Sequence, residues 1–256
     1  MKMFSVAACA GLLLVASSQM IWSASDRQQA DIRQTGVHKA AERYRGAFKD
    51  GKRHGRGALI FANGDRYLGD FRDGQITGQG QFAFANGDRY KGGVRLGKAH
   101  GRGLYVWAAG HRFEGDYRDG VAHGQGVFAW AGGHRYEGGY RNGKKHGRGT
   151  LTYADGNRYE GEWVDDTRHG DGVFIWVDGG RYEGEYRNGR RHGKGLRVWA
   201  NGQRYEGDYR NGTQHGYGVI HFAEGKVYSG AWLQGCFDNG LVKLWGDGKS
   251  RESCGF

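Results

Sequence analysis

The chain has 256 residues, a formal net charge of +11 and 25% charged residues. Glycine accounts for 51 residues and proline for none, which excludes collagen and argues against a disordered linker rich in both. Aromatic residues make up 14% of the chain, so we expect it to fold, and the basic balance favours anionic partners without specifying a fold.

Residues 1–25 are predicted to be a secretory signal peptide. Lys2 is followed by an uncharged stretch with leucines at its centre, and small residues allow cleavage before Asp26 or before Gln19. The alternative is an inner-membrane anchor through residues 3–24, because that stretch is just long enough to span a bilayer. We expect an exported protein of a bacterial periplasm or cell envelope.

Residues 26–43 are expected to form a short helical cap or linker. The segment is polar with a few apolar residues such as Ile32 and Val37, and Gly36 would interrupt a helix. Arrays of repeats need such capping segments at their ends.

Residues 44–235 contain eight repeats of 23 residues and a partial ninth, with no insertions. Each repeat begins with Tyr or Phe, at residues 44, 67, 90, 113, 136, 159, 182 and 205. We count this aromatic residue as position 1. Glycine then occupies positions 3, 12, 14 and 21 in all eight copies, so the glycine excess belongs to the repeat.

Each repeat is predicted to be a β-hairpin. Asn-Gly or Asp-Gly pairs recur at positions 7–8 and 20–21, as in Asn142-Gly143 and Asp155-Gly156, and such pairs are strong turn signals. The segments between them alternate with period two, which places each set of side chains on one sheet face. The predicted fold class is all-β: an elongated single-layer antiparallel meander of 23-residue hairpins, with a short N-terminal helix and a C-terminal cap.

The aromatic residues at position 18 are expected to supply the core, because a single-layer sheet has no second layer to pack against. We expect their rings to lie over strand glycines and to stack on their neighbours. The alternative is a face that binds a peptide, a partner helix or a second copy of the sheet. These residues are Phe61, Phe84, Trp107, Trp130, Tyr153, Trp176, Trp199 and Phe222.

The pattern Tyr136-Glu-Gly-Gly-Tyr, followed by Gly143, by His146-Gly-Arg-Gly and by Gly156, resembles the MORN (membrane occupation and recognition nexus) repeat. The resemblance covers Tyr44 to about Gly235. It implies a twisted sheet of β-hairpins with a scaffold, dimerisation or binding role, and anionic-lipid binding is often proposed for the family. It implies no enzyme activity by itself, and residues 26–43 and 236–256 are too short for a catalytic domain, so we expect neither an enzyme nor a cofactor.

A basic hairpin loop in the odd-numbered repeats is the leading candidate binding site. Its clusters recur every 46 residues, which would place them about 19 Å apart along one edge of the sheet. Such an edge suits an anionic membrane or envelope surface, whereas charge that only keeps the loops soluble is the alternative. The residues are Lys52, Arg53, Arg56, Lys98, Arg102, Lys144, Lys145, Arg148, Arg190, Arg191 and Lys194.

Two further columns of residues are expected to be structural. Histidine occupies position 11 in seven of the eight repeats, but one histidine per hairpin gives a line of rings about 10 Å apart, so we expect no metal site. Carboxylates at positions 2 and 4, such as Glu160 and Glu162, have basic neighbours on the same face. Cross-strand charge pairs explain them better than a hydrolase does.

Residues 236–256 are predicted to form a C-terminal cap closed by a disulfide. Removal of the signal peptide takes Cys9 away and leaves Cys236 and Cys254, an even pair in an exported protein. Two unrelated thiols are the alternative.

Together these patterns predict a non-enzymatic scaffold or binding protein of the cell envelope. The leading hypothesis is association with anionic lipid or another anionic surface through the basic loops. The alternative is binding of an unknown protein partner, or self-association as a homodimer, through the aromatic face. We expect no nucleic-acid partner, because an exported protein would seldom meet one.

Overall fold

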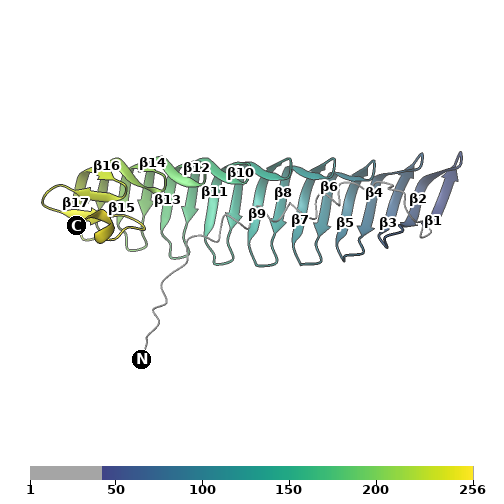
Figure 1. Cartoon of the computed structure of the whole chain (residues 1–256), viewed down its shortest axis with the longest axis horizontal. Helices are drawn as coiled ribbons and strands as arrows, with labels where there is room; N and C mark the ends of the chain where they lie inside the picture. The colour runs from purple at the N-terminus through teal and green to yellow at the C-terminus, as the bar shows by residue number, and fades with distance from the viewer. Residues whose placement is uncertain (1–41, 256) are drawn as a thin grey trace, which may run out of the picture. The chain divides into compact units, whose positions relative to one another are not determined.

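The computed structural model describes residues 42–255, so the predicted signal peptide or anchor and residues 26–41 of the predicted helical cap lie outside it. Within this range, nineteen strands belong to one antiparallel sheet that follows the chain as a meander, which confirms the predicted fold class (Figure 1). The described residues divide into two compact units. One holds residues 42–103 and 117–121, and the other holds residues 104–116 and 122–255.

Each repeat contributes one strand of seven residues and one of nine. The strands are β1 (Arg43–Lys49), β2 (Lys52–Ile60), β3 (Arg66–Arg72), β4 (Gln75–Ala83), β5 (Arg89–Arg95), β6 (Lys98–Val106), β7 (Arg112–Arg118), β8 (Val121–Ala129), β9 (Arg135–Arg141), β10 (Lys144–Thr152), β11 (Arg158–Val164), β12 (Thr167–Ile175), β13 (Arg181–Arg187), β14 (Arg190–Val198), β15 (Arg204–Arg210) and β16 (Thr213–His221). Arg43, the last residue of the predicted helical cap, belongs to β1.

The two turns predicted in each repeat are both present. Asn142 and Gly143, between β9 and β10, have φ values of 50° and 82°, as a two-residue type I′ hairpin requires. The second turn joins one repeat to the next, and there the Gly156 N–H donates to the Tyr153 carbonyl at 3.0 Å. Asp166 replaces the usual glycine at position 8 and keeps the left-handed conformation, with φ of 70°.

A bulge near the start of the nine-residue strands leaves the direction of their first side chains unchanged. In β10 the register shifts between Lys145 and Gly149, and Gly147 at position 12 has a φ of 71°. Ahead of this bulge, Lys145 at position 10 pairs with Tyr140 at position 5. The position-10 side chain therefore shares the face of the aromatic residues at position 5.

The core lies on the sheet face that carries positions 1, 5, 10 and 16, which we call the inner face. Tyr159, at position 1, is fully buried, and its ring centroid lies 5.2 Å from that of Trp163 in the same strand. It lies equally far, at 5.2 Å, from the ring of Tyr186 in the next repeat, again edge to face. Repetition of these contacts builds a ladder of rings. Each ring pair stabilises the fold by about 1 kcal/mol beyond the contribution from burial of its apolar area.

The rings over the strand glycines are those at position 1, which corrects the assignment of that role to position 18. A Cβ added to Gly161 would lie 2.5 Å from the Tyr159 hydroxyl and 2.6 Å from the Gly172 Cα. The same hydroxyl donates to the Glu162 carbonyl at 3.1 Å. Position 18 follows the end of the nine-residue strand, so its side chain does not stand over the glycine ladder, and all eight of these residues are half-buried.

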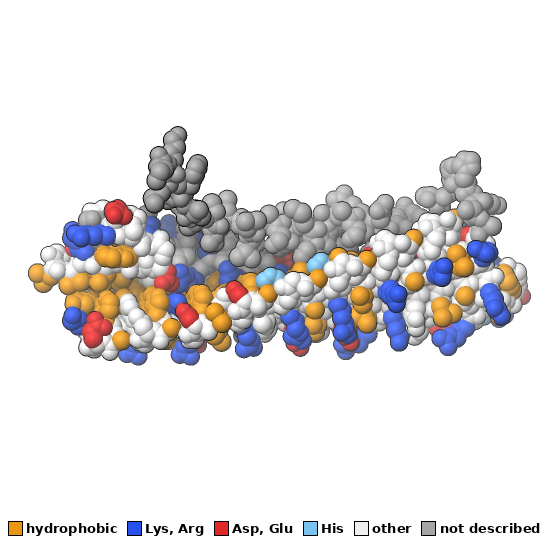
Figure 2. Space-filling model, turned by 90° about the horizontal axis from the view of Figure 1, so that it is seen from below, with side chains coloured by type: hydrophobic (Ala, Val, Ile, Leu, Met, Phe, Trp, Pro, Cys, Tyr) orange, Lys and Arg blue, Asp and Glu red, His pale blue; other side chains and the backbone are white. Residues whose placement is uncertain are grey.

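The opposite, outer face carries positions 2, 4, 6, 13, 15 and 17. On the side of the molecule that Figure 2 presents, Lys and Arg side chains recur along the described part of the chain with hydrophobic side chains between them. Arg158 and Glu160 form an ion pair of 2.7 Å on this face, two residues apart in β11. Ion pairs of this kind run along a strand, in addition to the cross-strand pairs that the sequence predicts.

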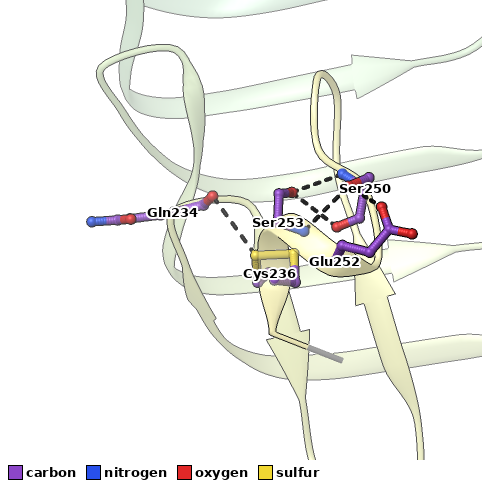
Figure 3. Close-up of a disulfide and its surroundings, with 6 residues drawn as sticks. Gln234, Cys236, Ser250, Glu252 and Ser253 are labelled. Carbon is purple, nitrogen blue, oxygen red and sulfur yellow. Dashed lines mark hydrogen bonds between the residues drawn. A yellow bond between two sulfur atoms is a disulfide. The ribbon is translucent and has the colours of Figure 1, made fainter.

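The last residues first continue the sheet and then fold back. β17 (Val227–Leu233) pairs with β18 (Cys236–Asp238), which pairs with β19 (Lys243–Trp245), and a short 3-10 helix, η1 (Glu252–Cys254), follows. Cys236 and Cys254 form a disulfide with their Cα atoms 5.6 Å apart, the pairing that the sequence predicts (Figure 3). No helix among residues 42–255 has the length and apolar character to cross a bilayer.

Candidate binding site on the inner face

The structure distributes the predicted basic residues over three environments. Position 9 holds Lys52, Lys144 and Arg190, which are exposed, and Lys98, which is half-buried. Position 13 holds Arg56, Arg102, Arg148 and Lys194, which are exposed on the outer face. Position 10 holds Arg53, Lys145 and Arg191, which point to the inner face. The eleven residues therefore do not form one basic edge.

The basic residues at position 13 stand beside carboxylates of the next repeat. Lys194 Nζ lies 2.6 Å from Asp208 Oδ1, and the hydrogen bond from Lys194 holds the pKa of Asp208 below its ordinary value. The strand register likewise places Arg56 opposite Asp70, and Arg148 opposite Glu162. These pairs reduce the net positive charge that the outer face presents.

The histidine column lies beside the turns. The Nδ1 atoms of His54, His100 and His146 each lie 3.6 Å from an aspartate of the next repeat. Among residues 42–255 no group of three or more His, Cys, Asp or Glu residues is placed to hold a metal ion.

The cations at position 10 lie over the rings of the inner face. Lys145 Nζ lies 4.8 Å from the ring centroid of Trp163 and 5.7 Å from that of Tyr136, and the residue is only 9% exposed. The Arg191 guanidinium lies 5.1 Å from the ring of Tyr209 and 5.5 Å from that of Tyr182. Such contacts are favourable because the ring face attracts a cation, the more so when water is excluded.

Three of these cations also meet a carboxylate. Arg53 Nη2 lies 2.7 Å from a Glu42 oxygen, and Lys145 Nζ lies 3.7 Å from Asp166 Oδ1. The third carboxylate, that of Asp247, comes from the C-terminal segment and lies 2.8 Å from Arg191 Nη1. The inner face is therefore a set of rings and cations on which acidic side chains dock.

Asp247 has the fullest set of contacts. Its Oδ2 accepts the hydrogen bond from Arg191, its Oδ1 accepts one from the Trp199 indole N–H at 2.9 Å, and Arg197 Nε lies 3.5 Å away. Burial opposes ionisation, but the hydrogen bonds from Arg191 and Trp199 hold the pKa of Asp247 below its ordinary value. The carboxylate therefore docks in its charged form.

The aromatic residues predicted at position 18 adjoin these cations. Trp130 lies 5.9 Å from Lys145 Nζ, and the Arg197 guanidinium stacks 3.6 Å from the Trp176 ring and 5.2 Å from the Trp199 ring. Sequence reasoning missed the inward direction of position 10, because it treated the basic residues of positions 9–13 as one hairpin loop. The alternation itself was the available signal, since position 10 has the same parity as position 16 on the inner face.

A meander of identical hairpins, with its core on one face and docked carboxylates on that face, defines a tandem β-hairpin repeat protein that serves as a binding scaffold. The family profile described as MORN repeat matches eight consecutive windows: residues 44–66, 67–89, 90–112, 113–135, 136–158, 159–181, 182–204 and 205–227. The chain therefore belongs to the MORN-repeat family, and each window starts at the aromatic residue that we count as position 1.

Solved structures show only distant likeness. The TCP10 domain of Danio rerio CPAP in complex with a peptide of Danio rerio STIL is 14% identical, with a TM-score of 0.44, over 75% of this chain and 84% of that chain. The SAS-4 (dCPAP) TCP domain of Drosophila melanogaster in complex with a proline-rich motif of Ana2 (dSTIL) is 12% identical, with a TM-score of 0.39, over 79% and 99%. TM-scores this low carry no functional argument. A comparison with curated proteins finds no match.

Proposed function

We propose that this MORN-repeat protein is a non-enzymatic scaffold that binds a partner protein through its inner face. The observation that carries the proposal is the docking of Asp247, because a segment of the chain itself already binds there through Arg191 and Trp199. The face offers a partner the residue types that dominate protein interfaces, aromatic rings and arginine. The half-buried rings at position 18 retain surface for contact.

The experiment is affinity capture from an envelope extract with the unaltered chain and two variants. Trp130→Ala with Trp176→Ala removes two inner-face rings, and Val177→Ala is the matched control because Val177 is 71% exposed and belongs to no ring cluster. A partner that is lost with the double variant and kept with the control supports the proposal, provided that both variants keep their folded circular dichroism. Equal capture by all three chains contradicts it. Size-exclusion chromatography of the same variants tests whether the partner is a second copy.

A second candidate function is association with an anionic membrane surface through position 9. The exposure of Lys52, Lys144 and Arg190 favours it, and each cation near such a surface contributes about 1 kcal/mol. Co-sedimentation of residues 26–256 with neutral and anionic vesicles, at low and physiological salt, tests it. Salt-sensitive binding to anionic vesicles alone that falls with Lys144→Glu and Arg190→Glu supports this function. Unchanged retention of that variant excludes it.

Export to the periplasm or cell envelope is part of the same proposal. It rests on the uncharged stretch after Lys2 and on the cysteine pair that remains after cleavage. The mass of the chain recovered from cells tests it. A chain that starts at Asp26 or Gln19 supports cleavage, whereas an intact chain in the membrane fraction supports the anchor.

A further inference from the structure

Arg168 differs from the other cations on the inner face. It occupies position 10 of an even-numbered repeat, where the other even repeats carry Ile76, Ala122 and Gln214. Arg53, Lys145 and Arg191 each contact a carboxylate, but no carboxylate within the described part of the chain lies at ion-pair distance from Arg168. Within residues 42–255 its guanidinium makes one hydrogen bond, from Nη2 to the Gly189 carbonyl at 3.0 Å.

Arg168 nevertheless has the surroundings of Arg191, one repeat earlier. Its guanidinium lies 5.5 Å from the ring of Tyr159 and 5.2 Å from that of Tyr186. The corresponding distances from Arg191 to Tyr182 and Tyr209 are 5.5 and 5.1 Å. Trp176 stands 23 residues before Trp199, so this repeat also carries the second donor type that Asp247 uses.

We propose that Arg168 and Trp176 form a docking position for a carboxylate on an acidic peptide segment of a partner protein. The proposal rests on the proposed function and specifies the chemistry of its partner. The guanidinium supplies a charged donor and the indole N–H a neutral one, the pair that holds Asp247 in the next repeat. Charge-assisted bonds to a carboxylate are stronger than neutral ones, so an acidic side chain is preferred over an amide.

The docked segment also indicates the local sequence that such a peptide needs. Asp247 lies between Gly246 and Gly248, and a Cβ on Gly246 would overlap the Gln214 side chain. In the docked segment the residue before the acid is therefore a glycine that lies against position 10 of the following repeat. Position 10 of the repeat after Arg168 is Arg191, and the test peptide keeps this glycine.

The test uses a fluorescein-labelled peptide with the sequence of residues 243–249, Lys-Leu-Trp-Gly-Asp-Gly-Lys, and a second peptide with Asn in place of the Asp. Binding to the full chain is followed by fluorescence anisotropy in about 0.15 M salt, which screens unspecific attraction to the basic protein. We expect the Asp peptide to bind, and the Asn peptide to bind at least about tenfold more weakly, since a bond between charged groups is lost.

The protein variants are Arg168→Gln, Arg168→Lys and, as matched control, Arg187→Gln on the exposed outer edge of β13. We expect Arg168→Gln to weaken binding of the Asp peptide about tenfold or more, Arg168→Lys to retain most of it, and Arg187→Gln to leave it unchanged. Retained binding by the lysine variant shows that a general loss of fold is not the cause.

Equal binding by Arg168→Gln and the unaltered chain would overturn the inference, as would equal binding of the Asp and Asn peptides. Failure of the Asp peptide to bind at about 1 mM would also overturn it. The proposed function fails differently, through partner capture that is insensitive to the loss of Trp130 and Trp176. Capture that depends on those rings but not on Arg168 would leave the function intact and reject only the carboxylate position.

Discussion

The pair of Lys145 and Asp166 offers a direct test of how the inner face tolerates charge. Lys145 is buried over three aromatic rings, and its nearest carboxylate is Asp166, with 3.7 Å between Nζ and Oδ1. We expect Asp166→Asn to destabilise the protein by about 3 kcal/mol. Asparagine tolerates the left-handed conformation at this turn and can still accept the hydrogen bond from the Lys145 N–H, so the change is mainly one of charge.

The magnitude follows from two limits. At 3.7 Å and an effective dielectric constant of about 20, the attraction is about 4.5 kcal/mol. Once it is lost, Lys145 can instead give up its proton, which at pH 7 costs about 4.6 kcal/mol from an ordinary pKa of about 10.4. Relaxation and water reduce both values, which leaves about 3 kcal/mol.

The structure also predicts how the loss of stability in Asp166→Asn changes with pH. Burial lowers the pKa of Lys145, and Asp166 opposes that effect, so the asparagine variant lowers it further. The unfolded chain then binds more protons than the folded one, and stability rises with pH toward the ordinary pKa of lysine. The deficit of the variant should therefore shrink between pH 7 and about 10.

The assay is urea unfolding followed by tryptophan fluorescence, since Trp130 and Trp163 adjoin the site. Glu160→Gln is the control, because its ion pair with Arg158 is exposed and worth at most about 1 kcal/mol. Adding Lys145→Met to Asp166→Asn should restore stability to within about 1 kcal/mol. The reasoning is refuted if Asp166→Asn costs no more than the control, or if the double variant is as unstable as the single one.

Three further predictions concern the fold. Gly161→Ala should lower the free energy of unfolding by at least about 3 kcal/mol, because the new Cβ would overlap Tyr159 and the facing backbone. Gly132→Ala is the control and should lower it by under about 1 kcal/mol, because a Cβ there meets nothing within 4 Å. Equal urea midpoints for the two variants would contradict this. Reduction of the disulfide should destabilise the C-terminal cap by about 3 kcal/mol, so unchanged hydrogen exchange of residues 236–254 would speak against it. Burial raises the pKa of Tyr67 to about 12, so the protonated hydroxyl contributes to the stability of the folded state. That contribution is present below pH 10 and is lost as the pH rises through about 12. Ultraviolet titration of Tyr67 in the folded chain near the ordinary pKa of 10 would be inconsistent with this prediction.

Much of the fold could be predicted because the same turn and strand signals recur in eight repeats. The turn at Asn142-Gly143 needs two left-handed residues, and the sequence supplies residues that adopt this conformation at low cost. Period-two alternation likewise identified Tyr136 and Tyr140 as neighbours on one face, and their rings are 5.3 Å apart. Both features depend on residues that are close together in the chain, so a single sequence is enough to predict them.

The candidate site could be predicted only in part, because part of it lies in strand residues that the sequence analysis assigned to a hairpin loop. The sequence analysis grouped Lys145 with Lys144 and Arg148 in one basic loop, but Lys145 belongs to β10 and faces inward opposite Tyr140. Asp247 was beyond reach for a different reason. It meets Arg191 across 56 residues, through a segment that folds back over the sheet, and no periodic pattern encodes such a contact.

The inner-face charges are informative because they depart from the rule of the repeat. Asp166 stands where the turn favours glycine, and Arg197 stands where the other repeats have apolar or aromatic residues. A repeat built for stability alone would have kept glycine and an apolar residue there, since both departures bring charge to a buried face. Such exceptions are expected at functional sites. Asp166 lies in repeat six with Arg168 and Trp176, and Arg197 of repeat seven stacks on the Trp176 ring. The fold comes from what the repeats share, and the binding chemistry that we propose comes from where repeats six and seven differ from the rest.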